Sequence, residues 1–200
     1  MKTNYDKVLD EIINKLNGRK PSILLHSCCA PCSTAVISRL KDYFDVTIFY
    51  YNPNIEPLEE YLKRKEEQKR IVSEFGIKFL DCDYENEKFK SMSKGLEDIP
   101  EGGYRCHKCY ELRLTKTALT AKENSFLYFG TTLTVSPYKN SQVLNAIGKD
   151  IEELTKVKFL YSDFKKKEGY KLSIELSKKY NLYRQNYCGC IYSKKQSEQN

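Results

Sequence analysis

Two patterns of hydrophobic residues alternate along the chain, one with helical spacing and one typical of buried strands. Apolar residues at 8, 12, 13 and 16 share one helix face, and Asn17-Gly18 provides a stop, so an N-terminal amphipathic helix is predicted. Short apolar runs predict five strands, at residues 22–26, 46–51, 77–80, 126–130 and 157–161. Further helices are predicted from Pro31, over 57–75, from the cysteine pair near 106 to about 124, and over 141–155 and 170–180.

This alternation of strands and helices predicts the fold. Parallel strands joined by right-handed crossovers form a sheet with helices on both faces. We therefore expect a single doubly wound, Rossmann-like α/β domain over residues 1–200, with a mostly parallel sheet of about five strands. Its parts are an N-terminal helix at 1–20, a parallel-sheet core at 22–161 and a cysteine-bearing C-terminal helical tail at 162–200. In the strand order 3-2-1-4-5, ligands bind beside the ends of the first and fourth strands.

Seven of the eight cysteines lie in three short clusters, the first of which directly follows the first predicted strand. The clusters are H-S-C-C-A-P-C from His26, R-C-H-K-C from Arg105 and Y-C-G-C from Tyr187. Clusters so far apart in sequence must meet in space to act together, and they supply more thiols than one structural metal requires. This surplus indicates redox chemistry. The eighth cysteine, Cys82, is predicted to be an ordinary buried residue.

The cysteine spacings are compatible with more than one cofactor. Four thiolates can hold zinc or a [4Fe–4S] cluster, and the residues alone leave both open. The adjacent pair Cys28-Cys29 favours the cluster, because neighbours reach separate irons of a cubane more easily than two corners of one tetrahedron. Cys188-Gly189-Cys190 either shuttles electrons through a strained disulfide or helps to bind metal. Cys32, in the first turn of a helix, is expected to have a lowered pKa.

Composition and charge favour a basic protein of the cytoplasm. The formal charge of +7 suits a polyanionic partner, and 16 tyrosines and 9 phenylalanines could stack on unpaired bases. The chain opens with a charged helix rather than a signal segment, and no apolar run approaches membrane-spanning length, so we expect a cytoplasmic protein without membrane association. Lys165–Lys167 are predicted at the functional edge of the sheet, whereas the basic stretch from Lys63 to Arg70 is expected to face solvent.

Five motifs, taken in order, resemble the QueH family of epoxyqueuosine reductases over roughly residues 23–193. They are C-C-A-P-C, R-C-H-K-C, T-T-L-T-V-S-P-Y-K, D-F-K-K and Y-R-Q-N-Y-C-G-C-I-Y-S. The resemblance implies a two-electron reduction of the epoxide of epoxyqueuosine, at the wobble position of a tRNA anticodon, to queuosine. This is the last step of queuosine biosynthesis, and the family is not expected to use cobalamin. The implied partners are tRNA carrying epoxyqueuosine and an electron donor that the sequence does not identify.

Carried over residue by residue, the resemblance assigns a role to each clustered cysteine. The ligands of a [4Fe–4S] cluster would be Cys28, Cys29, Cys106 and Cys109. Cys188 and Cys190 would be redox-active, as a disulfide or as metal ligands. Cys32 would belong to a second metal site, for which a mononuclear iron is the candidate, and is itself a candidate catalytic residue.

Further candidates lie in the same motifs. Removing an epoxide oxygen as water takes two electrons and two protons, and a Lewis acid on the oxygen eases C–O cleavage. Tyr187, Asp163 and Lys139 are the candidate proton donors. A wobble base must leave its stack to reach a buried centre, so a basic rim around the crevice is expected. The rim candidates are Arg105, Lys139, Lys165 and Arg184.

Three alternatives remain at the level of sequence. The first is a zinc-stabilised nucleic-acid-binding domain without catalysis, in which the four cluster cysteines form a structural site. The second is an ATP-dependent RNA-thiolation enzyme on a related fold, but the first strand-to-helix turn has no glycine-rich phosphate cradle. The third, a thiol oxidoreductase working by disulfide exchange, leaves Cys28, Cys29 and Cys32 unexplained.

Overall fold

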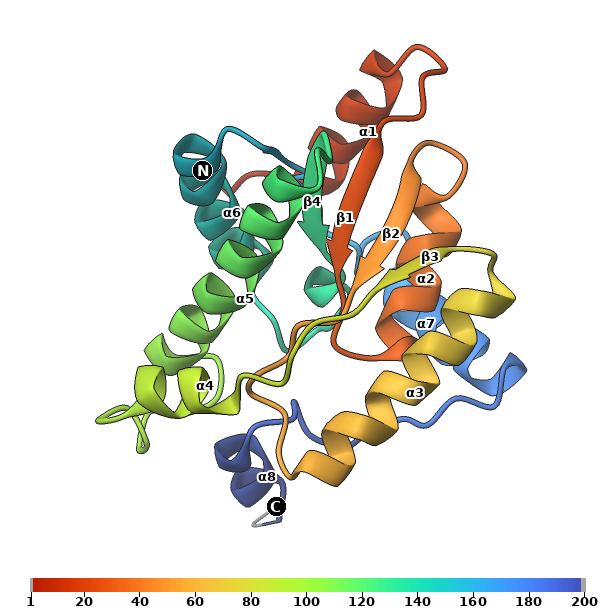
Figure 1. Cartoon of the computed structure of the whole chain (residues 1–200). Helices are drawn as coiled ribbons and strands as arrows, with labels where there is room; N and C mark the ends of the chain where they lie inside the picture. Colours follow the sequence, from red (N-terminus) through yellow and green to blue (C-terminus); the bar gives the residue numbers. More distant parts are fainter. Residues whose placement is uncertain (1, 199–200) are drawn as a thin grey trace.

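The five strands form one parallel sheet in a computed structural model that describes residues 2–198 (Figure 1). They are β1 (Ser22–His26), β2 (Asp45–Phe49), β3 (Lys78–Leu80), β4 (Tyr128–Thr131) and β5 (Lys158–Phe159), in the order β3-β2-β1-β4-β5. At the centre of the sheet, Ile23 of β1 pairs in parallel register with Val46 of β2 and Tyr128 of β4. The predicted doubly wound α/β fold and its strand order are therefore confirmed.

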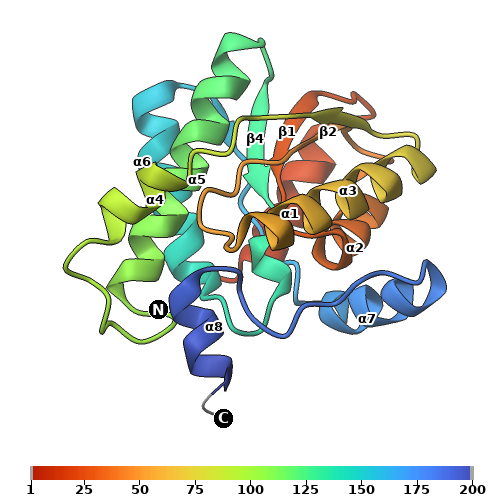
Figure 2. The ribbon, with the colours of Figure 1, turned by 60° about the horizontal axis from the view of Figure 1, so that its bottom comes forward.

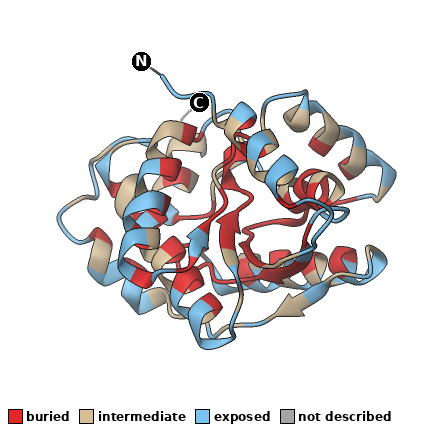
Figure 3. Cartoon of the chain, turned by 90° about the horizontal axis from the view of Figure 1, so that it is seen from above, coloured by how far each residue is buried: buried red, intermediate tan, exposed pale blue. Residues whose placement is uncertain are grey.

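Helices cover both faces of this sheet, and each face has its own core. One face carries α1 (Tyr5–Lys15), α2 (Ala30–Leu40), α3 (Leu58–Glu74) and α7 (Gly169–Lys179), and the other carries α5 (Tyr104–Glu123) and α6 (Ser141–Thr155). Side chains of β1 alternate between the two cores, Ile23 and Leu25 toward the first and Leu24 toward the second. The central strands β1, β2 and β4 are accordingly mostly buried between helices whose outer surfaces are exposed, whereas the edge strand β3 is not (Figure 3).

Local signals in the sequence explain where the main helices begin. The Asn4 side chain caps α1 by accepting from the backbone of Asp6 and Lys7, and Asn140 caps α6 by accepting from the backbone of Gln142. Pro31 occupies the first turn of α2, where its missing N–H costs no hydrogen bond. α2 and α6 begin within a residue of the predicted positions, whereas α1 begins at Tyr5, later than the predicted start at residue 1.

Four elements differ from the prediction. The structure adds α4 (Asn86–Ser93), α8 (Ile191–Glu198) and a 3-10 turn, η1 (Leu133–Val135), and it shortens the predicted last strand to the two residues of β5. α4 buries little apolar surface besides Phe89, and α8 has no apolar stripe, so neither shows helical periodicity. β5 lies at the sheet edge and pairs only with β4, which limits its length. No helix in the described part of the chain is both long and apolar enough to cross a membrane.

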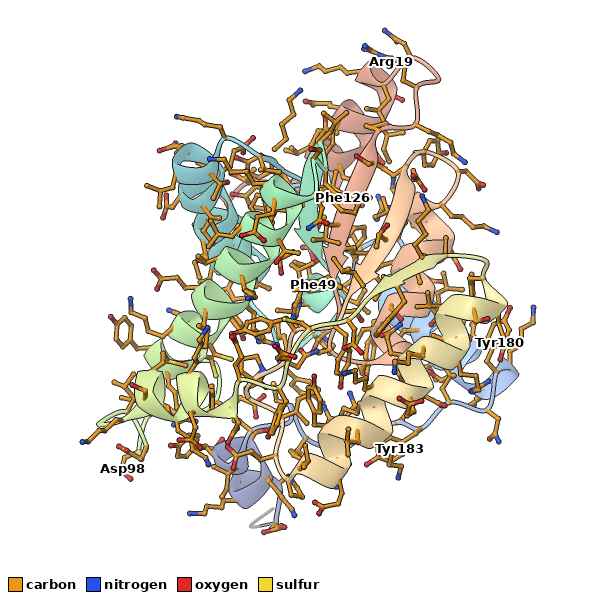
Figure 4. The ribbon with its side chains drawn as sticks, in the orientation of Figure 1. Arg19, Phe49, Asp98, Phe126, Tyr180 and Tyr183 are labelled. Atoms are coloured by element: carbon orange, nitrogen blue, oxygen red, sulfur yellow. The ribbon has the colours of Figure 1, made fainter. Side chains whose placement is uncertain are left out.

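The carboxyl ends of the strands face the C-terminal part of the chain. In Figure 1 the strands run downward toward α8, and Figure 2 brings this end forward with α8 in front. Phe49, the last residue of β2, lies near the middle of the molecule, whereas Arg19 and Asp98 point away from it (Figure 4). The loops after β1 and β4, which carry the first cysteine cluster and Thr132, therefore open toward the segment that carries the third cluster.

Candidate active site, a buried thiol centre

The first cysteine cluster lies in the turn that joins β1 to α2, and a buried hydrogen-bond network holds this turn. Asn52 donates to the Ser27 carbonyl at 2.8 Å, and the Ser27 hydroxyl donates to Gln68 Oε1 at 2.8 Å. Gln68 donates through Nε2 to Ser33 Oγ, also at 2.8 Å. A buried network of this kind specifies one conformation. The cysteines that follow Ser27 therefore have a defined position at the sheet edge.

Three thiols of this turn contact one another. Cys28 Sγ lies 3.8 Å from Cys29 Sγ, and Cys32 hydrogen-bonds with both. Hydrogen bonds with Cys28 and Cys32 lower the pKa of Cys29, whereas those with Cys28 and Cys29 raise the pKa of Cys32. Cys29 is thus the thiol of this trio whose ionised form its neighbours favour most. The lowered pKa predicted for Cys32 is wrong, because two neighbouring thiols use its S–H as a donor.

His26, the last residue of β1, joins three parts of the sheet edge. Its Nδ1 lies 3.1 Å from Thr131 Oγ1, and its Nε2 lies 3.1 Å from the Tyr51 carbonyl. Complete burial lowers the pKa of His26 to about 3. The ring is therefore neutral near pH 7. Thr131 and Thr132 are also buried beside the first cluster, across the switch point at which the strand order reverses.

The second cluster occupies the first turns of α5. Cys106 and Cys109 are three residues apart and share one helix face, and the Gly102 backbone N–H donates to Cys106 Sγ at 3.3 Å. Arg105 is buried, and its Nη1 donates to the carbonyls of the preceding loop, at Leu96, Glu97 and Ile99. This guanidinium holds the loop in place. Arg105 therefore does not belong to an exposed RNA-binding rim, contrary to the prediction.

The segment that leads to the third cluster runs along α3, where Tyr180 and Tyr183 are visible in Figure 4. Arg70 donates to the Tyr180 carbonyl at 3.0 Å, and Glu67 accepts from the Tyr183 backbone N–H at 2.8 Å. One turn closer to the N-terminus of α3, Arg64 donates to the Cys188 carbonyl at 3.0 Å. Side chains on successive turns of one helix thus guide this irregular segment to the end of the sheet.

The third cluster packs against the second. Cys190 belongs to an apolar cluster with Phe89 and Cys109, and Gly189 has a φ of 135°, a conformation that favours glycine. All eight cysteines are free thiols in this structure, so a disulfide between Cys188 and Cys190 is not formed here. Cys82 is half-buried against the same hydrophobic core as Cys28 and Cys29, and its electrostatic neighbours are Lys116 and nearby acids. We call the seven clustered residues the thiol centre: Cys28, Cys29, Cys32, Cys106, Cys109, Cys188 and Cys190.

Three buried cations surround the thiol centre. Lys139 is 8% exposed and donates to Cys188 Sγ at 3.1 Å. Burial opposes its charged form, but the Cys188 thiol outweighs burial and raises the pKa of Lys139. Lys139 therefore lies inside the site and not on its rim, contrary to the prediction. Arg64 and Arg113 are each 1% exposed and were not predicted as site residues.

Helical spacing in the sequence indicates that Arg64 and Arg113 lie on buried helix faces. Arg64 lies in a basic stretch that was expected to face solvent, yet it falls three residues after Tyr61 and four before Gln68, on the buried face of α3. That expectation is wrong for Arg64. Arg113 follows Cys109 by four residues, which places it on the cysteine-bearing face of α5.

A cavity of about 370 Å³ opens onto the thiol centre. Its lining includes the first cluster, one residue of the third and two further candidates: Cys28, Cys29, Cys32, Cys188, Tyr187 and Lys139. Tyr138 and Arg184 also line it. Asp163 and Lys165 instead line a neighbouring cavity of about 580 Å³. The structure thus brings most candidate residues to one cavity and leaves Asp163 and Lys165 beside it.

The donor chemistry of the thiol centre suits a metal cofactor with thiolate ligands. Within residues 2–198, no three His, Cys, Asp or Glu side chains are arranged around one point as the ligands of a single ion are. Two thiol pairs, Cys28-Cys29 and Cys106/Cys109, begin two different helices, and buried cations accompany them. Such a set provides thiolates together with positive charge that would balance an anionic group.

The parallel sheet and the thiols gathered at its carboxyl edge define a doubly wound α/β protein with a multi-thiol centre at the switch point. A family model described as "Epoxyqueuosine reductase QueH" matches residues 23–196. The chain therefore belongs to the QueH family of epoxyqueuosine reductases, as its motifs predicted.

Relatives in this family match most of the chain. An epoxyqueuosine reductase QueH from Staphylococcus epidermidis is 46% identical over 202 residues, which are 96% of this chain and 85% of that protein. One from Thermotoga maritima is 39% identical and covers 86% of this chain and 90% of its own. Among solved structures, the U34-tRNA thiolase NcsA from Methanococcus maripaludis, with its [4Fe–4S] cluster, matches with a TM-score of 0.56 at 13% identity, over 96% of this chain and 71% of that one. This last likeness concerns the fold.

Proposed function

We propose that this chain is an oxidoreductase that removes the epoxide oxygen of epoxyqueuosine in the wobble position of tRNA, giving queuosine and water. The observation that carries the proposal is that the first and third cysteine clusters line one cavity and the second packs against the third, at the switch point of a fold whose family is named for this activity. Each epoxide consumes two electrons and two protons. An external electron donor must return the enzyme to its starting state.

The first part of the proposal concerns the cofactor. A [4Fe–4S] cluster held by Cys28, Cys29, Cys106 and Cys109 would supply electrons one at a time. Two observations support this ligand set. Cys28 and Cys29 directly precede α2, and Cys106 and Cys109 lie in the first two turns of α5, while a solved protein with a similar fold carries a [4Fe–4S] cluster.

The second part concerns Cys188 and Cys190, which we propose as a redox pair. Oxidation of two thiols to a disulfide releases two electrons and two protons, the amount that one epoxide consumes. Lys139 donates to Cys188 Sγ at 3.1 Å and so orients this sulfur toward the cavity that both residues line. Gly189 permits the sharp turn between the two cysteines.

The third part concerns the departing oxygen. Tyr187 lines the cavity, so we assign it as the proton donor; its hydroxyl, which here donates to the Glu56 carbonyl at 3.0 Å, must turn toward the substrate to act. Cys32 is assigned to a second metal site, where a mononuclear iron would act as a Lewis acid. Asp163 forms an ion pair with Lys165 at 3.0 Å in the neighbouring cavity, so we assign it to positioning Lys165 and not to proton transfer.

The fourth part concerns the RNA. An unstacked wobble base enters the 370 Å³ cavity, because chemistry on a base requires its removal from the stack. Tyr138 is 77% exposed and lines both cavities, which suits a ring that stacks on a neighbouring base. Arg184 lines the first cavity and Lys165 the second, so both can contact the phosphate backbone.

Anaerobic purification followed by measurement of iron, acid-labile sulfide and zinc tests this function, together with conversion of epoxyqueuosine-containing tRNA under a chemical reductant. We expect about four iron and four sulfide per chain, queuosine in the digested tRNA, and iron in excess of sulfide if the second site is filled. Cys109→Ser should abolish both cluster and product, whereas Cys82→Ser, outside the thiol centre, should retain both. Stoichiometric zinc without sulfide would contradict the proposal and support a structural module.

The role of Cys32 has its own test. Aspartate can ligate iron but cannot act as a thiol, so Cys32→Asp should keep activity and Cys32→Ala should lose it while both retain the four-iron cluster. Full activity in Cys32→Ala would remove Cys32 from the mechanism.

A further inference from the structure

Arg113 is a buried cation whose charge the surrounding protein leaves largely unbalanced. Its side chain is 1% exposed, and its Nε donates to the Cys109 carbonyl at 3.2 Å. Its buried Nη2 has no hydrogen-bond partner. The Tyr110 ring lies 5.6 Å from the guanidinium carbon and supplies only a weak cation–π contact. A buried charge with so few partners is costly unless an anion accompanies it.

Two other buried arginines of this chain differ from Arg113 in their partners. Arg64 pairs with Glu60 at 2.6 Å and donates to the Cys188 carbonyl. Arg105 donates through Nη1 to three carbonyls of the preceding loop and lies 4.3 Å from the Tyr192 ring, while its Nε and Nη2 have no hydrogen-bond partner. Arg105 and Arg113 both form no ion pair with a carboxylate of the described residues. Arg105 is directed to the loop carbonyls, whereas Arg113 has thiols as its neighbours, so Arg113 is the one placed to balance an anionic thiolate cofactor.

The neighbours of Arg113 show where that anion belongs. The Nε bond to the Cys109 carbonyl ties the guanidinium to the second cluster, and Cys188 and Cys28 are its other thiol neighbours. These three cysteines come from all three clusters. Arg113 also lies four residues after Cys109 and seven after Cys106, on one face of α5. It therefore faces the middle of the thiol centre.

We infer that Arg113 is the counter-charge of the cofactor held by the thiol centre and that it raises the cofactor's reduction potential. The inference rests on the proposed function, since it takes that cofactor to be a thiolate-ligated iron–sulfur cluster. A fixed positive charge favours the state with one more electron, and net charge near a cluster is one of the factors that set its potential. Arg113 is thus a positioning and tuning residue that does not contact the reacting atoms.

The deciding experiment measures the midpoint potential of the reconstituted full-length chain by a redox titration followed by electron paramagnetic resonance. Arg113→Met keeps a long apolar side chain and removes the charge. We expect the equilibrium constant for uptake of one electron to fall about tenfold, or about 59 mV toward negative potential. Arg113→Lys restores the charge and should recover most of the difference. Lys122→Gln, an exposed charge change on the same helix, should leave the potential unchanged.

A second measurement needs no cofactor. If the charge is unbalanced, the cluster-free Arg113→Met chain should unfold at the same temperature as the cluster-free wild type or at a higher one, because replacement of a buried charge by an apolar residue is neutral or stabilising. A lower unfolding temperature with an unchanged potential would show that Arg113 only supports the Cys109 carbonyl, and would overturn the inference. Wild type without iron and sulfide would instead refute the proposed function, while the cluster-free comparison would still test whether Arg113 is unbalanced.

Discussion

The first and third cysteine clusters meet at one centre but are held there by different means. The turn with Cys28 and Cys29 continues the central strand β1, and buried core residues such as Asn52 and Gln68 fix it. The Cys188–Cys190 segment follows an irregular stretch outside the sheet and depends on polar contacts such as that from Arg64. The difference teaches that the position of the first cluster is a property of the fold, whereas that of the third depends on a few side chains.

A single helix serves both regions. Arg64 and Gln68 lie one turn apart on the buried face of α3, the first bound to the third cluster and the second to the turn of the first cluster. Substitutions on α3 can therefore break the two supports separately. Urea unfolding reports global stability, and the rate at which Cys28 or Cys190 is alkylated in the native state reports local opening of each region.

Arg64→Ala should have the largest effect. It leaves Glu60 without its buried partner and removes the donor to the Cys188 carbonyl, so we expect a loss of about 3–5 kcal/mol in the free energy of unfolding. Alkylation of Cys190 should accelerate more than that of Cys28. Arg70→Ala, exposed on the same helix and bound to the same segment, should cost about 1 kcal/mol or less. If alkylation of Cys28 and Cys190 accelerated equally in Arg64→Ala, the two clusters would not be supported by different contacts.

Gln68→Leu should produce the opposite pattern. It removes one buried hydrogen bond from each of the Ser27 and Ser33 hydroxyls, which keep their bonds to the Cys29 and Ala30 carbonyls, and we expect this to cost about 1–3 kcal/mol in urea unfolding. Because the loss lies in the core, Cys28 and Cys190 should become more reactive together, in proportion to global unfolding. Gln142→Leu, at a half-buried glutamine outside the core whose hydrogen bonds with Thr3 are exposed, should stay within about 0.5 kcal/mol of wild type. If Gln68→Leu accelerated alkylation of Cys190 but not of Cys28, the expectation that the two cysteines react in proportion to global unfolding would be wrong.

The same contrast explains how far the sequence could predict the structure. The position of the first cluster follows from local signals, an apolar strand before it and Pro31 after it, and both were confirmed. Arg64 was missed because charged residues fill most of α3, and its buried face becomes evident only when Arg64 and Gln68 are accepted as core residues. The pKa of Cys32 depends on thiols that meet it in space, which no helix-start rule contains.

Gly189→Ala tests the third region without removing a polar contact. With φ at 135°, alanine is strained there, and its Cβ would lie 2.9 Å from Ile55 Cγ1, so we expect a loss of about 1–3 kcal/mol. The loss should appear as faster alkylation of Cys188 and Cys190. Gly18→Ala supplies the control, because Gly18 also has a positive φ of 77° but has nothing within 4 Å of its Cβ position. In Gly18→Ala the free energy of unfolding should fall because of backbone strain alone, and the alkylation rate of Cys190 should not change.

Ser193→Ala should have the smallest effect and locate the support of Cys188 most narrowly. The Ser193 hydroxyl accepts from the Cys188 backbone N–H at 3.0 Å and donates to Glu101 at 2.7 Å, so it joins α8, the third cluster and the loop before α5. Alanine retains the helix and removes both bonds, at a cost of about 1 kcal/mol, which corresponds to about fivefold more local opening.

Alkylation of Cys188 should therefore accelerate about fivefold in Ser193→Ala while the urea midpoint barely moves. Ser197→Ala removes a hydroxyl that bonds only within α8, to the Lys194 carbonyl, and should leave Cys188 unchanged. An unchanged alkylation rate of Cys188 in Ser193→Ala would mean that Arg64 holds the segment without help from α8. The third cluster would then depend on α3 alone, and α8 would serve some purpose other than closing the thiol centre.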